Sequence, residues 1–292
     1  MRYRITHSTS YQYASSIGLC HNLACLLPRT TPNQQVVSSY LQITPRAASI
    51  DEWTDFFGNR RHHFAIQRAH QDLTVTAHSE VVIRPVPFPG LLQTTRWVEA
   101  RDDMLHDLSP AGLEARTYIL PSPYIAPTPA IRAFAEGSFQ PNATVLEAML
   151  DLNHRIFSEF TYDPHFTTVV TPLEEVLQHR RGVCQDFAHL AIACVRAMGI
   201  PARYVSGYLE TLPPPGQEKL QGADASHAWL SVYDPILGWI DFDPTNDQIP
   251  SHQHITIAWG RDYSDVSPLK GIFFGVSEQQ LRVAVDVNRV GD

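Results

Sequence analysis

The sequence lacks the features that mark several large classes of protein. No apolar stretch approaches the ~20 residues that a helix needs to cross a bilayer, and the N-terminus has no apolar core typical of a secretory signal. Runs of Lys or Arg are also missing, and the formal net charge is −8. A net acidic chain without a basic cluster argues against nucleic acid or a membrane surface as a partner. We therefore expect a soluble protein of the cytoplasm.

Cysteine is scarce, while histidine is abundant. The four cysteines are too few for a disulfide scaffold in a chain of 292 residues, and no CxxC pair occurs, so a Cys-rich zinc site is not predicted. Fourteen histidines invite a metal hypothesis, notably at His62–His63 and at His252 and His254. Neither pair has a recognisable third and fourth ligand, so we interpret them as surface histidines.

The first 84 residues carry the alternation of apolar and polar side chains that is typical of half-buried strands. Residues 37–43 and 73–83 show it most clearly. Between them, the turn-forming segment 57–60 is flanked by aromatic and apolar residues, which predicts a hairpin. Hydrophobic residues make up 43% of the chain, enough to fill a full-sized core. We expect residues 1–84 to form an antiparallel β-sandwich-like domain.

Proline marks a change of organisation after this domain. Eight prolines fall within residues 85–129, and because proline breaks helices and strand ladders, we interpret this segment as a connector with one short helix. Helical periodicity begins at residues 131–135 and continues at 145–157, where Asn142 is the expected N-cap. Residues 171–174 resemble a capping box that opens a further helix.

The best-defined helix covers residues 187–198, where apolar residues recur every three or four positions until Gly199 ends the pattern. A Pro/Gly-rich segment at 212–222 is expected to form a surface loop over a cleft. We expect residues 130–292 to form one core that includes the strand-like runs near the C-terminus. Strands are predicted in this core at 202–209, 228–233 and 239–243.

Cys184 stands out because it lies at the start of this helix, directly after a glycine-containing turn. Unpaired N–H groups and the helix dipole favour negative charge at such a position, so the sulfur can act as a thiolate nucleophile. The N–H of Cys184 can also donate to an oxyanion that develops beside it. The position makes Cys184 a candidate nucleophile, and a small buried apolar residue is the alternative interpretation until partners for the sulfur are found.

His227 and Asp243 are symmetric about residue 235, which lies in the predicted turn between two strands. An antiparallel hairpin folded there places them opposite each other, on the same face. The carboxylate can then orient the imidazole, whose other nitrogen can take the proton of a thiol. Asp241 shares the strand parity of Asp243 and is the alternative carboxylate.

Three motifs together resemble those of the transglutaminase-like superfamily, and they occur in the order of that family: Cys, His, Asp. The N-terminal segments 26–29 and 57–59 and the C-terminal segment 260–263 also resemble bacterial members. The matching segments are 181–188 and 199–203 for the nucleophile helix and the following strand, 225–229 for the histidine motif, and 238–245 for the aspartate motif.

The resemblance implies an α+β fold with a papain-like transglutaminase core, in which the nucleophile helix packs on an antiparallel sheet, preceded by the β-sandwich-like domain. It implies a triad of Cys184 as nucleophile, His227 as general base and then acid, and Asp243 as orienting carboxylate, with no metal or cofactor. We expect a peptide or protein substrate and hydrolysis of amide bonds through an acyl-enzyme. A protein-glutamine acyltransferase with an amine acceptor, and a non-catalytic binding protein that retains the fold, stay open as alternatives.

Other residues have secondary roles in this hypothesis. Members of the family use an upstream side chain as a second oxyanion donor, and Tyr162 is the candidate here. Gln185 is a candidate for oxyanion or substrate binding, and Trp229 is expected to share the strand face of His227 and to wall the substrate groove. Asp186 lies in the first helical turn and is expected to complement the dipole. Cys194 falls on the apolar face of the helix and is expected in the core.

Overall fold

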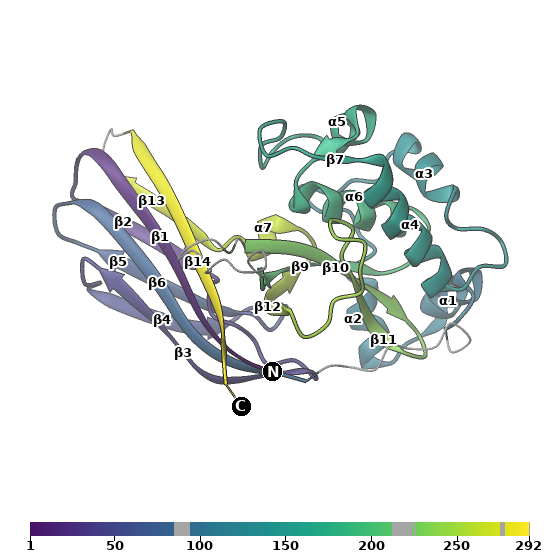
Figure 1. Cartoon of the computed structure of the whole chain (residues 1–292), viewed down its shortest axis with the longest axis horizontal. Coiled ribbons are helices and arrows are strands. Elements are labelled where there is room, and N and C mark those ends of the chain that lie inside the picture. The colour runs from purple at the N-terminus through teal and green to yellow at the C-terminus, as the bar shows by residue number, and fades with distance from the viewer. Residues whose placement is uncertain (85–93, 212–223, 225, 275–277, 292) are drawn as a thin grey trace.

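The computed structural model describes residues 1–84, 94–211, 224, 226–274 and 278–291. The segment 212–222, expected to cover a cleft, lies outside these residues. Within them the chain forms an all-β part, hereafter the β-domain, and a mixed part of helices and strands, hereafter the core (Figure 1). No helix in these ranges is both long enough and apolar enough to cross a membrane.

The β-domain consists of two four-stranded antiparallel sheets that enclose an apolar cluster. The predicted alternation of β6 is confirmed, because every second side chain from Leu73 to Ile83 is buried. The hairpin predicted at 57–60 joins β4 to β5, with Gly58 in the left-handed region at φ 78°. One sheet has the order β14 (Gln279–Val290), β1 (Arg2–Ile17), β6 (His70–Ile83), β3 (Gln34–Thr44), and the other has the order β13 (Leu269–Phe274), β2 (Leu19–Ala24), β5 (Arg60–Ile66), β4 (Ser49–Thr54).

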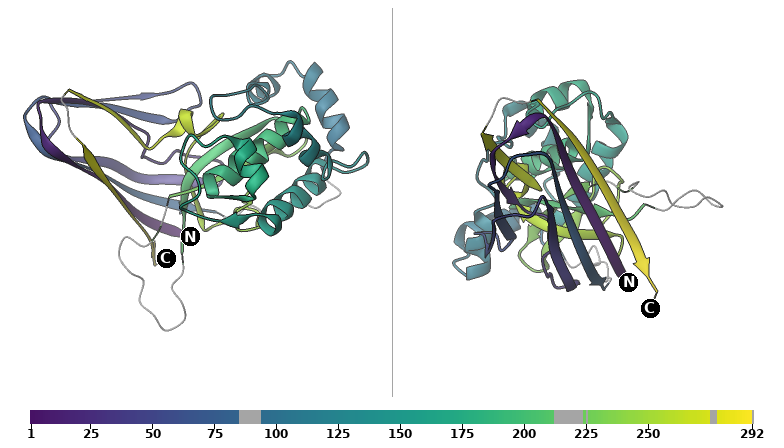
Figure 2. Two further views of the ribbon diagram at one scale, coloured as in Figure 1. Left: turned by 90° about the horizontal axis from the view of Figure 1, so that it is seen from above. Right: turned by 90° about the vertical axis from the view of Figure 1, so that its left-hand side faces the viewer.

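The last two strands of the chain complete these two sheets. β14 pairs with β1 along its length, from Arg2 opposite Val290 to Tyr13 opposite Gln279. β13 pairs with β2 in the other sheet. The strand-like runs near the C-terminus were expected to belong to the core, but their hydrogen bonds place them in the β-domain. The two ends of the chain consequently lie side by side (Figures 1 and 2).

The core is built on a four-stranded antiparallel sheet with helix α6 (Cys184–Ala197) packed against its two central strands. Every side chain of α6 from Asp186 to Arg196 is buried, so this helix is enclosed rather than amphipathic. It ends as predicted before Gly199, which has φ 83°. The order of the sheet is β11 (Gly238–Phe242), β10 (Ser226–Asp234), β9 (Ala202–Leu209), β12 (His254–Gly260).

The other helices differ in detail from the prediction. The described part of the segment expected to hold one short helix, residues 94–129, contains the two helices α1 and α2. The cap of the long helix α4 is Thr144 instead of Asn142, since Thr144 and Glu147 form a complete capping box. The box predicted at 171–174 is not formed, because Pro172 is the N-cap of α5 and the hydroxyl of Thr171 accepts from Thr168 N–H instead. The remaining elements are α1 (Trp97–His106), α2 (Pro110–Arg116), α3 (Pro129–Glu136), α4 (Val145–Glu159), β7 (Thr161–Tyr162), α5 (Leu173–His179), β8 (Arg181–Gly182) and α7 (Tyr263–Val266).

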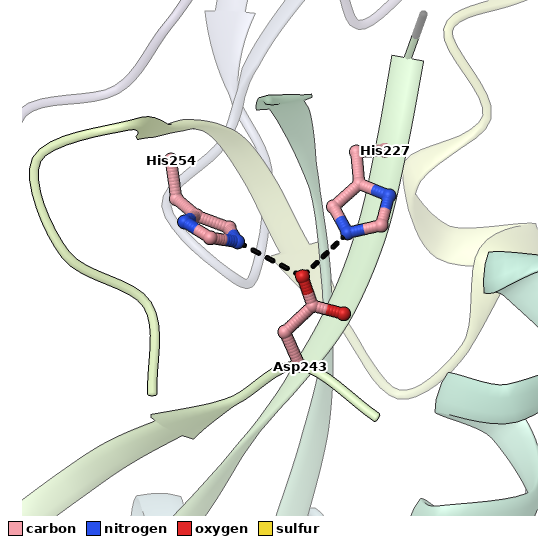
Figure 3. Close-up of side chains that lie close together, drawn as sticks. All are labelled: His227, Asp243 and His254. Carbon is pink, nitrogen blue, oxygen red and sulfur yellow. Dashed lines mark hydrogen bonds and ion pairs between the residues drawn. The ribbon is translucent and has the colours of Figure 1, made fainter. Parts of the chain in front are cut away.

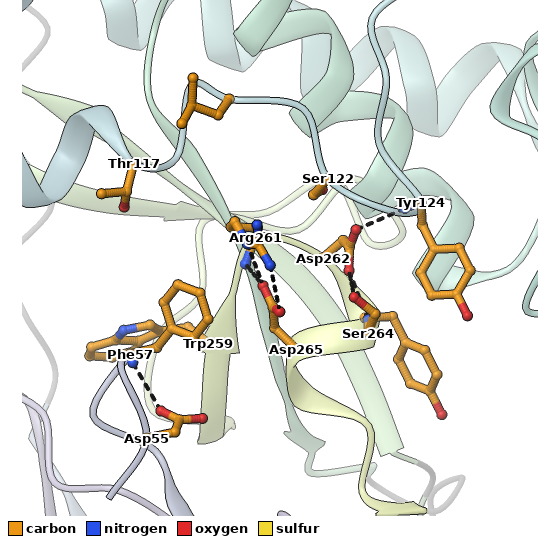
Figure 4. Close-up of polar contacts among 12 residues, drawn as sticks. Asp55, Phe57, Thr117, Ser122, Tyr124, Trp259, Arg261, Asp262, Ser264 and Asp265 are labelled. Carbon is orange, nitrogen blue, oxygen red and sulfur yellow. Dashed lines mark hydrogen bonds and ion pairs between the residues drawn. The ribbon is translucent and has the colours of Figure 1, made fainter.

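The β-domain covers one edge of the core sheet, the edge formed by strand β12. Two amide side chains of the β-domain each bind both main-chain groups of one residue in this strand. Gln34 accepts from Thr256 N–H at 2.9 Å and donates to its carbonyl at 2.7 Å, and Asn59 does the same with Trp259 at 3.0 and 2.8 Å. Arg29 connects the adjoining turn to the same strand, because it donates to the carbonyl of Phe57 at 2.8 Å and lies over the ring of Trp259 (Phe57 and Trp259 are drawn in Figure 4). These bonds replace a neighbouring strand and protect the edge.

Candidate active site

The turn that leads into α6 positions the sulfur of Cys184. The carboxylate of Asp186 accepts from the N–H of Val183 at 2.8 Å and from the hydroxyl of Thr167 at 2.6 Å, which fixes the first turn of the helix. Gly182 is needed here, because a Cβ atom at this position would lie 2.8 Å from Asp186. Burial raises the pKa of Asp186. As expected, this carboxylate serves the start of the helix.

Cys184 is the first residue of α6 and is half-buried, unlike the three other cysteines, which are buried. The first N–H groups of a helix have no acceptor within the helix, so those of Cys184 and Gln185 can donate to an oxyanion. Gln185 is also half-buried. The sulfur therefore combines access with a positive electrostatic environment.

His227 and Asp243 form a direct pair, as the hairpin predicted. Nε2 of His227 lies 2.7 Å from Oδ2 of Asp243 (Figure 3). The register differs by two residues from the expectation, since Leu230 pairs with Phe242 and the hairpin is centred on residue 236. Asp243 lies just beyond the end of β11 and is completely buried. Its carboxylate still binds His227, although the two residues are not paired with each other in the sheet.

Four N–H groups converge on the carboxylate of Asp243. Oδ2 accepts from His227, from Nε2 of His254 at 3.0 Å and from Nδ2 of Asn246 at 2.8 Å, while Oδ1 accepts from the N–H of Thr245 at 3.0 Å. Burial opposes ionisation, but these hydrogen bonds hold the pKa of Asp243 well below its usual range. The buried carboxylate is thus kept as an anion.

The environment of His227 favours its protonated form. Burial alone would lower the pKa of His227, but hydrogen bonds to Asp243 and Cys184 and the negative charges of both raise it to about 10. Asp243 contacts Nε2 of His227, and the other ring nitrogen, Nδ1, points away from Asp243 (Figure 3). The structure therefore brings Cys184, His227 and Asp243 together in that order, with charges suited to a thiolate–imidazolium pair.

His254 is a residue of this site that the sequence reasoning missed. It was interpreted as a surface histidine, but it is buried at 5% exposure and bonded to Asp243. His62, at 4% exposure, is likewise buried and not on the surface. The sequence signal nearest to His254 is the strand-like run that follows it. This pattern does not place His254 at the site, because its place there depends on the pairing of β12 with β9.

A metal ion is the other interpretation of this cluster. The ligand atoms of His227, Asp243 and His254 lie within 4.8 Å of one another, and two histidines with one carboxylate are a donor set that zinc accepts. However, the amide nitrogen of Asn246, which cannot ligate a metal, lies 2.8 Å from Oδ2 of Asp243 and 3.3 Å from Nε2 of His227, between the would-be ligand atoms. These contacts suit a hydrogen-bonded carboxylate better than a metal centre.

Trp229 lies behind the site and does not wall an open groove. It is fully buried, its ring lies 6.1 Å from that of His227, and its Nε1 donates to Asp241 at 3.0 Å. Asp241 therefore binds Trp229, not the imidazole. On the neighbouring strand, Gly207 pairs with His227, and a Cβ there would lie 2.5 Å from the Trp229 ring. The glycine makes room for the tryptophan beneath the histidine.

Tyr162 lies on β7, which pairs with the strand that precedes Cys184. Its side chain is 53% exposed, and its ring lies 6.5 Å from that of Phe187 on α6. Burial raises the pKa of Tyr162, and the negative charge of Cys184 raises it further. The phenol therefore stays neutral and can donate a hydrogen bond. Cys194 is fully buried, as expected.

Two family models match the chain. The model for the bacterial transglutaminase-like N-terminal region matches residues 3–82, and the model for the transglutaminase-like superfamily matches residues 132–244. The chain belongs to the transglutaminase-like superfamily. The second match includes the start of α6, His227 and Asp243, so the resemblance found in the sequence motifs is confirmed.

Relatives of this superfamily member extend over its full length. An uncharacterized protein of Mycobacterium tuberculosis is 42% identical over 300 residues, which cover 98% of this chain and 92% of the relative. A protein-glutamine gamma-glutamyltransferase of Pseudomonas aeruginosa is 33% identical over 127 residues, or 42% of this chain and 19% of that protein. The structure of a putative cysteine protease from Cytophaga hutchinsonii superposes with a TM-score of 0.76 at 23% identity, covering 100% of this chain and 92% of that one. The expected fold class is thereby confirmed.

Proposed function

We propose that the protein is a thiol-dependent hydrolase of amide or peptide bonds, with Cys184 as nucleophile, His227 as general base and acid, and Asp243 as orienting carboxylate. The observation that carries the proposal is the continuous contact from the helix-start sulfur through the imidazole to a buried carboxylate. Membership of a superfamily of cysteine-based enzymes supports it. The substrate is a peptide or protein that presents an amide carbonyl to α6.

The geometry supports a two-step reaction. The thiolate of Cys184 attacks the carbonyl carbon, and the resulting oxyanion accepts from N–H groups at the start of α6, with Tyr162 as the second donor. His227 gives its proton to the leaving nitrogen, the C–N bond breaks, and an acyl-enzyme remains. Water then gives a proton to His227 and attacks the thioester, which releases the acid and restores the thiolate–imidazolium pair. Asp243 stays ionised throughout.

A second candidate is acyl transfer from protein glutamine to an amine. The observation that favours it is the similarity over 127 residues to the Pseudomonas protein-glutamine gamma-glutamyltransferase. The first half-reaction is the same and releases ammonia. An amine instead of water then attacks the thioester, so the two functions differ only in the second nucleophile.

Parallel assays on a peptide library distinguish these functions. One assay measures hydrolysis, and the other measures incorporation of a fluorescent primary amine into glutamine peptides, with Cys184→Ala as the blank in both. We expect thiol-dependent hydrolysis. Amine incorporation that outpaces hydrolysis would establish the acyltransferase instead, whereas binding of peptides with no turnover in either assay would leave the non-catalytic binding protein.

The cytoplasmic location stays a prediction. All four cysteines are free thiols, which is typical of a reducing compartment. Fractionation of cells that express the tagged full-length chain tests this directly. Recovery of the protein outside the cytoplasm would refute it.

A further inference from the structure

We propose that His254 is a positioning residue for the Cys184–His227–Asp243 triad, and that the β-domain holds His254 in place through Gln34. The inference rests on the proposed function, since it concerns the same site. It starts from the observation that Asp243 has two histidine partners, although a triad needs only one. The second histidine belongs to β12, the strand that the β-domain covers.

The contacts of His254 define its role. Nε2 donates to Oδ2 of Asp243, whereas Nδ1 is buried and has no partner among the residues that the structure describes. A proton on Nδ1 would therefore be unsatisfied, whereas a proton on Nε2 is satisfied by Asp243. The ring packs edge-on against Trp229 at 5.2 Å. His254 thus acts as a fixed donor that orients the carboxylate.

The β-domain determines where this donor lies. β12 is an edge strand, with β9 on one side only, and its pairing with β9 is interrupted by a register shift between Thr256 and Ala258. On the open side, Gln34 binds both main-chain groups of Thr256, two residues from His254. Gln34 also donates to the carbonyl of Arg29 at 2.8 Å, which anchors it in its own domain. Any displacement of Gln34 is therefore transmitted to His254 and then to Asp243.

The expected consequence concerns the thiolate–imidazolium pair. The titratable groups that the structure places against His227 are Asp243 after β11, Cys184 on α6 and His254 on β12, and Asn246 adds a neutral amide. Without the donor on β12, Asp243 loses one of its orienting bonds and His227 is held less firmly beside the sulfur. The thiolate is then less stabilised, and its formation requires a higher pH.

The first experiment measures the rate of Cys184 alkylation by iodoacetamide against pH in the full-length protein. For His254→Leu we expect the midpoint to move up by about one pH unit, because a hydrogen bond to the charged site is lost. His254→Gln keeps an N–H near the position of Nε2 and should restore the midpoint. His252→Leu, two residues away and outside the site, is the matched control and should leave it unchanged.

An unchanged midpoint in His254→Leu would overturn the proposal, as would an equal shift in His254→Gln. If His254→Leu does not fold, as judged by its circular dichroism, His254→Asn is measured instead, because its shorter amide does not reach Asp243. Alkylation needs no substrate. If the wild type alkylates at mildly acidic pH but turns over no amide, the proposed function fails while the positioning role is still tested.

The second experiment tests the link to the β-domain by a double-mutant cycle with Gln34→Ala. We expect Gln34→Ala to raise the alkylation midpoint in the wild-type background and to add little in the His254→Leu background, since both act through one donor. Where turnover is measurable, kcat should fall about tenfold in either single variant, with KM unchanged. Additive shifts in the cycle would show that Gln34 acts on Cys184 independently of His254, and no shift in Gln34→Ala would show that it acts on stability alone; either result would refute the link.

Discussion

Among the residues that the structure describes, a cysteine lies beside a histidine both in the β-domain and in the core, and the pair in the core resembles a catalytic site. In the β-domain, Sγ of Cys20 lies 3.6 Å from Nε2 of His70 and accepts from the amide of Asn22 at 3.3 Å. In the core, Cys184 meets His227, whose far nitrogen binds a carboxylate. Proximity of sulfur and imidazole is common to both pairs, so other features must separate them.

Three differences distinguish the pairs. Cys20 lies within a strand at 1% exposure, whereas Cys184 is half-buried at a helix start. Burial raises the pKa of Cys20. The other nitrogen of His70 binds a main-chain carbonyl, that of Arg68, which does not stabilise an imidazolium as a carboxylate does. A reactive thiol thus requires a helix dipole, a charged partner for the imidazole, and access.

The largest expected effect is the loss of turnover in Cys184→Ala. The nucleophile is removed, so kcat should fall by at least about 10⁴-fold, while the melting temperature stays close to that of the wild type because the side chain is small and half-buried. Cys20→Ala is the matched control. It should leave kcat unchanged and cost about 1 kcal/mol of stability. Turnover retained by Cys184→Ala would reject the assignment of the nucleophile.

The next effect is that of Asp243→Asn, which makes the core pair resemble the pair in the β-domain. We expect kcat to fall by about 10³- to 10⁴-fold, because an amide neither fixes the tautomer nor stabilises the imidazolium. Asp241→Asn is the control and should affect stability only. Equal losses in both variants would contradict the preference for Asp243.

The same variant should change the pH dependence. In the wild type, the pKa of His227 is raised to about 10, so the imidazolium persists at neutral pH and is lost only as pH rises through that value. The stabilisation that it contributes to the folded state is complete below about 6.5, the unperturbed value, and declines as pH rises towards 10. In Asp243→Asn the alkaline limb of turnover, which needs the imidazolium as the acid, should move to lower pH. If turnover falls at the same alkaline pH in the variant and the wild type, Asp243 does not raise the pKa of His227.

A smaller effect is expected in the order of thiol labelling. At pH 6, iodoacetamide should modify Cys184 about 100-fold faster than Cys20, Cys25 or Cys194, because only the first is accessible and paired with an imidazolium. Peptide mapping by mass spectrometry measures the four rates in one experiment. Equal, slow labelling of all four cysteines would support the non-catalytic binding protein.

The smallest expected effect is that of Tyr162→Phe. Removal of the phenolic hydroxyl should lower kcat about tenfold without changing KM. This fall in kcat is smaller than that expected for the loss of a buried oxyanion donor, because Tyr162 is half exposed. Tyr40→Phe, on an exposed face of the β-domain, is the control. A change in KM alone would reassign Tyr162 to substrate binding.

The sequence predicted the local parts of the site better than its long-range parts. The helix at Cys184 and the His227–Asp243 hairpin follow from periodicity and from a turn, so an error of two residues in register did not separate the pair. His254 could not be predicted in the same way, because its contact with Asp243 depends on the pairing of β12 with β9. Nothing in a strand-like pattern specifies its partner.

The same limit explains the assignment of the C-terminal strands. Alternation identified the strand at 281–287, but its partner is β1, at the opposite end of the sequence. Helix caps failed for a different reason. Asn142 and Thr144 are both good N-caps, and the reciprocal bond with Glu147 decides between them.

The pairing of β14 with β1 also has a consequence for biosynthesis. Strand β1 is translated before the whole core, yet it acquires its neighbour β14 only after the core has been translated. The domain that emerges first is therefore among the last to be completed. Since this domain holds the strand next to the reactive centre, the site of a nascent chain would not reach its final geometry before β14 has been translated.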